Sequence, residues 1–224
     1  MFDKQRRVDC SNELLTIINL NEEKFWQSIV TGDETWVHHW DPESKQESMQ
    51  WKHRGSPPPS KFRVQASAGT MMASIFWDTE SILLIDYLPP KATITGIYYA
   101  HLIRRLRDAI KEKWRGKLKT GIWLLHDNAP VHKSMVAASA IRDCGFVELD
   151  HPAYSSDLAP SDFFLFKNLK HHLRGKRFGD NSEVKDEIES YFESNNQSWF
   201  SEGIRLLKMR YEKCIDIGGG YVEK

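Results

Sequence analysis

Hydrophobic and polar positions alternate at several places along the chain, and this pattern indicates β-strands. From Ile29 to Trp36 successive residues fall on two faces, so Asp33 and Glu34 should point to opposite sides of a sheet. The motif Asp78–Ser81 reads as the turn of a hairpin. Short apolar runs between turn residues predict further strands at 64–68, 71–77, 82–87, 122–126 and 146–149.

Other segments carry the three-to-four-residue period of amphipathic helices. Thr95 is placed to cap a helix from Gly96 to about Lys113, and Ser161 is placed to cap a helix that begins at Asp162. Asp162 shares one stripe with Leu165, Phe166, Leu169 and Leu173, so its carboxylate should face the body of the protein. Further helices are expected at 11–26, 133–144, 183–193 and 199–213, followed by a loose tail at 218–224.

Composition describes an ordinary globular chain. Its 224 residues are 40% hydrophobic, which is enough for the core of one sizeable domain. Lys plus Arg and Asp plus Glu are both 31, so the net charge is zero and does not by itself indicate a polyanionic partner. Two segments, 104–119 and 167–177, are nevertheless locally basic. Solvated helix faces are the usual explanation for such runs.

Cysteine usage and hydropathy indicate the kind of cellular compartment in which the protein works. Cys10, Cys144 and Cys214 are odd in number and far apart, which argues against a disulfide framework and for a reducing compartment. The two adjacent histidine pairs lack partners at zinc-binding spacing. No apolar run is long enough to span a bilayer, and the first residues lack a signal-peptide core. We therefore expect a soluble intracellular protein without membrane contact.

The stretch "GIWLLHDNAPVHKS", Gly121 to Ser134, ends an apolar strand on a carboxylate, Asp127. One interpretation is purely structural, because Asp and Asn before a proline often begin a turn. The other is that Asp127 is an acidic ligand at the carboxyl end of a strand, where open α/β sheets carry their sites. Asp33, Asp157 and Asp162 are its candidate partners.

Carboxylates gathered by folding repel one another, and a hard divalent cation relieves that repulsion. Mg²⁺ prefers oxygen ligands; it is usually held by one or two carboxylates and keeps several bound waters, whose positions substrate phosphate can take. Two such ions about 4 Å apart can stabilise both the attacking and the leaving oxygens of a phosphoryl displacement. The chemistry suggested by this cluster is therefore metal-dependent phosphoryl transfer.

Three long motifs resemble the catalytic domain of mariner-type transposases, of the Tc1/mariner superfamily. They are "VTGDETWVHHWDPESKQESMQWKHRGSPPPSKFR", "LLHDNAPVH" and "HPAYSSDLAPSDFFLFKNLK", and the match extends from Phe2 to the C-terminus. The order of strands and helices also suits the fold that this resemblance implies, an RNase H-like mixed α/β sheet flanked by helices. By motif, the resemblance assigns Asp33, Asp127 and Asp162 as the catalytic, metal-binding triad.

The resemblance further implies Mg²⁺ or Mn²⁺ as cofactor, with two ions at the site. It implies cleavage of double-stranded DNA at transposon ends and strand transfer into target DNA, by a nuclear homodimer. On this interpretation 1–26 is a remnant of the interdomain linker with its leading helix, 27–217 is the catalytic domain, and 40–62 resembles the family's dimer clamp. The helix-turn-helix region that reads the transposon ends should precede Met1 and is expected to be absent.

Residues around the triad have weaker assignments. We expect His126, Asn128 and His132 to shape the strand tip, with DNA contact as the alternative. Ser156 replaces a proline of the family's pattern, which should leave the loop before Asp162 less stiff. The candidates for DNA contact are the basic residues of the 167–177 run and one histidine: Lys167, Lys170, Arg174, Lys176, Arg177 and His132.

Two other function classes compete with the enzyme. A module that keeps the fold but serves only in DNA binding or dimerisation would explain the missing reader region, whereas the intact carboxylates favour catalysis. A carboxylate-pair glycosidase needs two opposed acids and no metal, and it leaves the third acid unexplained.

Overall fold

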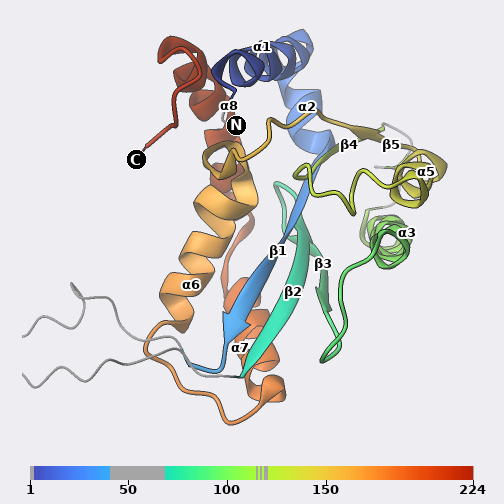
Figure 1. Ribbon diagram of the computed structural model, residues 1–224, viewed down its shortest axis with the longest axis vertical. Coiled ribbons are helices and arrows are strands. Elements are labelled where there is room, and N and C mark those ends of the chain that lie inside the picture. The colour runs from blue at the N-terminus through green and yellow to red at the C-terminus, as the bar shows by residue number, and fades with distance from the viewer. Residues whose placement is uncertain (1–2, 41–68, 115, 117, 119–120, 224) are drawn as a thin grey trace, which may run out of the picture.

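A five-stranded mixed sheet forms the middle of the protein, in a computed structural model that describes residues 3–40, 69–114, 116, 118 and 121–223 (Figure 1). Its strand order is β3-β2-β1-β4-β5. The first three strands are antiparallel, whereas β4 pairs in parallel with both β1 and β5. The strands are β1 (Ile29–His38), β2 (Thr70–Trp77), β3 (Ile82–Tyr87), β4 (Ile122–Leu125) and β5 (Phe146–Glu148).

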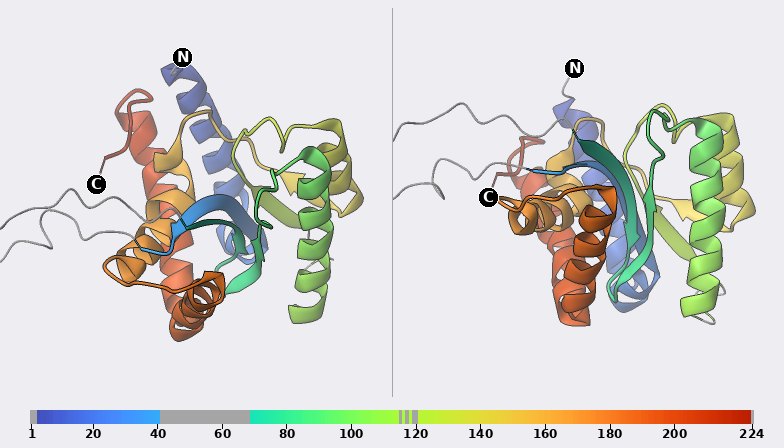
Figure 2. Two further views of the ribbon diagram at one scale, coloured as in Figure 1. Left: turned by 60° about the horizontal axis from the view of Figure 1, so that its bottom comes forward. Right: turned by 90° about the horizontal axis from the view of Figure 1, so that it is seen from below.

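Helices cover both faces of the sheet, as Figure 2 shows from two further directions. One face carries α3 (Gly96–Lys113) and α5 (Met135–Asp143). On the other side lie α1 (Lys4–Leu20), the π-helix η2 (Ser161–Phe166) with its continuation α6 (Lys167–Leu173), α7 (Asn181–Ser194) and α8 (Gln197–Asp216). The short α2 (Glu22–Ser28) leads directly into β1. This arrangement confirms the predicted mixed α/β class.

Alternation along the strands divides the core into two clusters. Ile29 and Ile75 pack on the side of α8, whereas Val30 and Phe76 pack on the side of α3 and α5. Continued along β1, the same alternation places Asp33 on the α8 side and Glu34 on the α3 side. The prediction that these two carboxylates point to opposite faces is therefore confirmed.

Local capping explains where several elements begin. The Thr95 hydroxyl accepts a hydrogen bond from the Tyr98 amide, as predicted, and the Asp78 carboxylate accepts from two amides of the expected hairpin turn. The helical turns expected at 11–26 are confirmed but belong to two helices: Asn21 ends α1, and its side chain caps α2 by accepting from the Lys24 amide. The predicted strand at 64–68 and, apart from Trp40, the clamp-like segment 40–62 lie outside the described residues.

Ser161 does not cap the helix of Asp162, contrary to the prediction. Pro160 occupies the cap position, and the Ser161 hydroxyl instead accepts a hydrogen bond from the indole nitrogen of Trp77 at 3.1 Å. Because Trp77 is fully buried, its N–H needs an acceptor inside the protein. The apolar stripe behind Asp162 is buried as expected, at Leu165, Phe166, Leu169 and Leu173.

The C-terminal segment, predicted to be loose, is anchored. Val222 is 4% exposed, and its amide donates to Oδ2 of Asp157 at 2.7 Å. The carbonyls of Gly219 and Gly220 both accept from the Arg7 guanidinium. Gly219 has φ +77°, and a Cβ there would collide with the Lys4 backbone. The glycine run therefore permits a close approach to α1 and does not mark flexibility.

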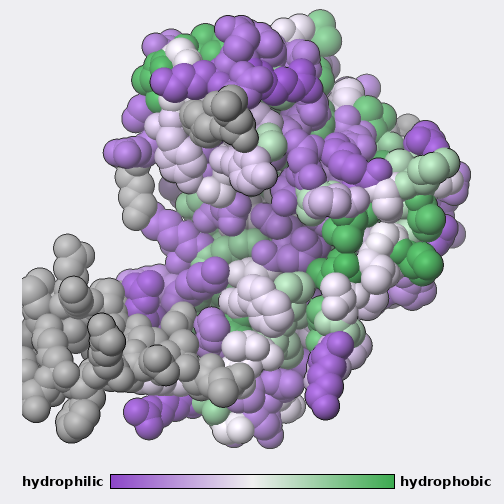
Figure 3. Space-filling view, in the orientation of Figure 1, coloured by the Kyte–Doolittle hydropathy of each residue, from purple (hydrophilic) through white to green (hydrophobic). Residues whose placement is uncertain are grey.

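Hydrophilic residues cover the middle of the face seen in Figure 3, over the region where β1 lies beside the end of β4. All three cysteines are free and buried. None of the described helices combines the length and apolar composition required to cross a membrane.

Candidate active site

Strand pairing brings two of the three aspartates to the same level of the sheet. Thr31 of β1 pairs with Leu125 of β4 in parallel register, so Asp33 and Asp127 each lie two residues beyond this pair. The π-helix η2 packs against β1 and presents Asp162 from the next layer. The structure thus places all three sequence-predicted aspartates around the carboxyl end of the central parallel pair.

Electrostatic coupling links the three carboxylates. Burial raises the pKa of Asp33 well above its usual range, and the negative charges of Asp162, Glu34 and Asp127 raise it further. Burial also raises the pKa of Asp162, with Lys170 opposing and Asp127 adding to the shift. Each carboxylate therefore makes ionisation of its neighbours more costly.

This donor set fits a hard divalent cation. All three side chains offer oxygen, and their mutual repulsion is the kind that such an ion relieves. Within the described part of the chain, no three His, Cys, Asp or Glu side chains form a ready-made metal cage. Mg²⁺ does not need one, because it is usually held by one or two carboxylates together with water and substrate phosphate.

Asp127 differs from the other two aspartates because its neighbours lower its pKa and so stabilise its ionised form. Burial alone would raise its pKa, but hydrogen bonds from His132 and from the Ala129 amide lower it below the usual value. Oδ1 of Asp127 lies 2.7 Å from Nδ1 of His132 and 3.0 Å from the Ala129 nitrogen. For His132, burial lowers the pKa, but the interactions with Asp127 and Glu34 outweigh it and raise the pKa to about 9.

A second buried network supports the strand tip. The Tyr99 hydroxyl lies 2.7 Å from Nδ1 of His126, and Nε2 of His126 lies 3.1 Å from Oε1 of Glu148. The His126 bond lowers the pKa of Glu148 to about 2 despite the opposing effect of burial, and Lys133 contributes to the lowering. The Asn128 amide donates to the His151 carbonyl. His126 and Asn128 thus shape the strand tip, as expected.

The candidates for DNA contact separate into distinct environments. His132 is wrong for that role, because its side chain is 1% exposed and both ring nitrogens face carboxylates. Lys176 pairs with Glu187 at 2.7 Å, and the Arg177 guanidinium lies over the Trp40 ring at 5.0 Å. Lys170 is exposed and acts electrostatically on Asp162. For Lys167, Lys170, Arg174, Lys176 and Arg177, DNA contact stays a prediction.

Asp157 does not join the three aspartates, although it was a candidate partner of Asp127. Its carboxylate is buried against Arg7, with guanidinium nitrogens 2.9 Å from Oδ1 and 2.6 Å from Oδ2. Sequence reasoning missed Arg7. A signal existed, since Arg7 shares the buried stripe of α1 with Ser11, Leu14 and Ile18 at spacings of four, seven and eleven.

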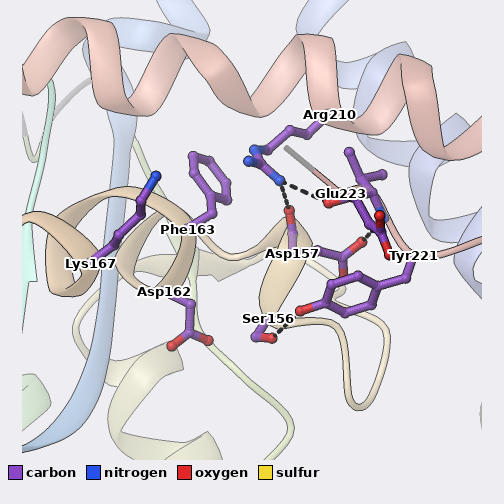
Figure 4. A pocket seen from close by; sticks show the side chains of 9 residues that line it. Ser156, Asp157, Asp162, Phe163, Lys167, Arg210, Tyr221 and Glu223 are labelled. Atoms are coloured by element: carbon purple, nitrogen blue, oxygen red, sulfur yellow. Dashed lines mark hydrogen bonds between the residues drawn. The ribbon is translucent and has the colours of Figure 1, made fainter. Parts of the chain in front are cut away.

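A pocket of about 640 Å³ opens beside Asp162, between η2, α8 and the C-terminal segment (Figure 4). Phe163 and Arg210 face each other in it, with the guanidinium carbon 4.3 Å from the ring centroid. The Ser156 and Tyr221 hydroxyls lie 2.8 Å apart at its edge. Ser156 thus ties its loop to the C-terminal segment.

Comparison with known proteins shows which sequences this chain resembles. Residues 41–120 match the family model described as a transposase (partial DDE domain). The chain is 29% identical over 221 residues to the mariner Mos1 transposase of Drosophila mauritiana, covering 98% of this chain and 63% of that protein. It is equally similar to the histone-lysine N-methyltransferase SETMAR of Homo sapiens, of which it covers 32%. The chain thus spans less than two thirds of either relative.

Solved structures agree with the sequence comparison. The Mos1 mariner paired end complex with Mn superposes with a TM-score of 0.90 at 30% identity, covering 98% of this chain and 63% of that one. The isolated catalytic domain of Mos1 gives 0.81 at 27% identity, with 98% and 95% covered. The chain is therefore similar over nearly its whole length to mariner-type transposases, and its fold is the RNase H-like fold of their catalytic domain.

Proposed function

We propose that the chain is a divalent-metal-dependent DNA endonuclease and strand transferase of the mariner type. The observation that carries the proposal is the meeting of Asp33, Asp127 and Asp162 where β1, β4 and η2 converge. Their coupled electrostatics explain why the chain keeps three acids there. A module that served only in DNA binding would be more stable without this repulsion.

Asp33, Asp127 and Asp162 would hold Mg²⁺ or Mn²⁺, and we propose two ions. When bound, such ions stabilise the attacking and leaving oxygens of an in-line displacement at phosphorus. The oxygen-only donor set supports this choice of metal. The Mos1 paired end complex has been solved with Mn and with Mg.

The chain's own residues provide the remaining parts of the site. Asp127 is kept ionised by His132 and by the Ala129 amide, so it is ready to bind a cation at neutral pH. Lys170 lies near enough to influence Asp162 and is exposed, which suits it to meet a DNA phosphate. The Tyr99–His126–Glu148 network holds the loop that carries Asp127.

Double-stranded DNA is the proposed substrate, both as transposon ends and as target. This is supported by the relatives, since Mos1 has been solved in complexes with its transposon ends. We further propose that the active form is a homodimer, because joining two ends to one target requires two catalytic sites. Such chemistry on chromosomal DNA implies a nuclear location.

Metal removal tests the proposed activity directly. The purified chain should nick supercoiled plasmid when Mg²⁺ or Mn²⁺ is supplied and should be inactive in excess chelator, because the carboxylates alone cannot stabilise the leaving oxygen. Conversion of supercoiled to open-circular plasmid on a gel measures the reaction. Equal nicking with and without chelator would exclude metal catalysis, and no nicking with either metal would favour the DNA-binding or dimerisation module.

DNA binding by this chain should be weak, steeply salt-dependent and nearly blind to sequence. Base-edge contacts carry sequence discrimination, whereas we expect the exposed basic residues near Asp162 to contact phosphates. A competition titration at fixed salt, with a mariner inverted repeat and a scrambled duplex of equal length, measures the preference. A tenfold preference corresponds to about 1.4 kcal/mol, roughly one good base contact. A preference of that size would show that the catalytic domain itself reads sequence.

A further inference from the structure

His132 lies inside the site but has almost no contact with solvent. Its side chain is 1% exposed, and its Nδ1 lies 2.7 Å from Oδ1 of Asp127. On the other side of the ring, Nε2 lies 3.4 Å from Oε2 of Glu34, an ion-pair distance with poor hydrogen-bond alignment. Glu34 belongs to β1 and Asp127 follows β4, so one imidazole ring bridges the two strands that carry Asp33 and Asp127.

Aromatic contacts hold this ring in place. The centroid of the Tyr99 ring lies 3.9 Å from that of His132, and the His126 ring stacks at 5.1 Å. Tyr99 and His126 are themselves joined by a 2.7 Å hydrogen bond and are both buried. The orientation of His132 is therefore determined by its packing as well as by its two carboxylate partners.

The two oxygens of Asp127 have different surroundings. Oδ1 accepts from the Ala129 amide at 3.0 Å in addition to its bond with His132. Among the described residues no donor contacts Oδ2, and the side chain is 43% exposed. One oxygen is thus occupied by the protein, and the other is left to face the solvent.

We propose that His132 is a positioning residue for Asp127: its Nδ1–H holds Oδ1, which leaves Oδ2 free for a metal ion, and the charge of Glu34 holds the ring from the Nε2 side. The inference rests on the proposed function, because it needs Asp127 to be a metal ligand. Groups that orient a metal ligand typically change metal affinity by about 10- to 100-fold when they are removed. The sequence-based assignment of His132 to DNA contact is replaced by this role.

Two conservative variants separate positioning from simple packing. In His132→Asn the amide nitrogen can take the place of Nδ1 and still donate to Asp127, whereas in His132→Gln it takes the place of Nε2 and faces Glu34. Both variants remove similar ring contacts. Binding of Mn²⁺ without DNA, measured by electron paramagnetic resonance of the free ion, reports affinity independently of catalysis.

We expect His132→Gln to raise the dissociation constant of the Asp127-dependent Mn²⁺ by about tenfold or more, and His132→Asn to stay within about threefold of the native chain. If His132 only fills space, both variants weaken Mn²⁺ binding alike, in proportion to their loss of thermal stability. The matched control is His172, whose Nε2 lies 2.6 Å from Glu187 and whose ring stacks on Tyr191 at 4.3 Å. His172→Asn and His172→Gln should leave Mn²⁺ binding unchanged.

The outcomes separate this inference from the proposed function. Equal Mn²⁺ binding by the native chain and Asp127→Asn would overturn both. Metal binding that depends on Asp127 but is unchanged in His132→Gln would overturn only the positioning role. If neither His132 variant folds, nuclear magnetic resonance of the native chain decides: the His132 Nδ1 proton should be protected from exchange, and this protection should be lost in Asp127→Ala, which removes the acceptor, but kept in Asp162→Ala. Protection that survives Asp127→Ala would overturn the inference.

Discussion

Replacing Asp127 with Asn is expected to lower metal-dependent nicking to the level of the metal-free reaction. The neutral amide offers a poorer ligand to Mg²⁺ or Mn²⁺, and it loses the charge that His132 and the Ala129 amide stabilise. The amide oxygen can still accept from both donors, so the free energy of unfolding should change by only about 1 kcal/mol. Plasmid nicking and the thermal unfolding midpoint, measured on one preparation, separate the two effects.

The matched control for this variant is Asp108→Asn, which makes the same chemical change at an exposed position of α3. Its nicking rate should equal that of the native chain. Nicking that survives Asp127→Asn at more than a tenth of the native rate would remove Asp127 from the mechanism. Loss of folding in the variant would show that the carboxylate is structural, which its half-exposed position argues against.

Replacing Arg7 with Met should cause a large loss of stability, about 3–5 kcal/mol. Arg7 is 1% exposed and donates to both oxygens of Asp157 as well as to the carbonyls of Gly219 and Gly220. Without the guanidinium, Asp157 remains as a buried and uncompensated charge. At about 2–4 °C per kcal/mol for a domain of this size, the unfolding midpoint should fall by on the order of 10 °C.

The neighbouring arginine supplies the control for this prediction. Arg6 also pairs with an aspartate, Asp150, but its side chain is 51% exposed, so Arg6→Met should cost less than about 1 kcal/mol. The double variant Arg7→Met with Asp157→Asn should recover part of the loss, because it removes the unpaired charge. A similar midpoint for Arg7→Met and Arg6→Met would show that the buried pair does not hold the C-terminal segment and the loop before Asp162 together.

Arg7 also connects stability to the site. Asp157 lies in the 3-10 turn Ser156–Leu158, only five residues before Asp162, and that turn packs on η2. Loosening the anchor should therefore displace the third aspartate as well as destabilise the fold. This coupling explains how the loop at Ser156 can place Asp162: Tyr221 and Val222 hold it from the C-terminal side.

The sequence by itself determined the class of fold and the location of the chemistry. Alternation in β1 separated Asp33 from Glu34, the Thr95 cap marked the start of α3, and the apolar stripe after Asp162 was correctly predicted to be buried. These features depend on neighbours within a few residues, and local periodicity records them. The assignment of three aspartates came from motifs whose order and spacing match one family.

Only the tertiary structure decided which partners those residues have. Arg7 pairs with Asp157, which lies 150 positions away in the chain, and His132 pairs with Glu34, which lies 98 positions away. No local sequence pattern reports contacts over such separations. Ser161 could not be recognised as an acceptor for Trp77, nor the glycine run as a close contact with α1, because both depend on what packs against them. Buried polar groups must find partners wherever the fold supplies them, so their roles emerge from packing and not from sequence position.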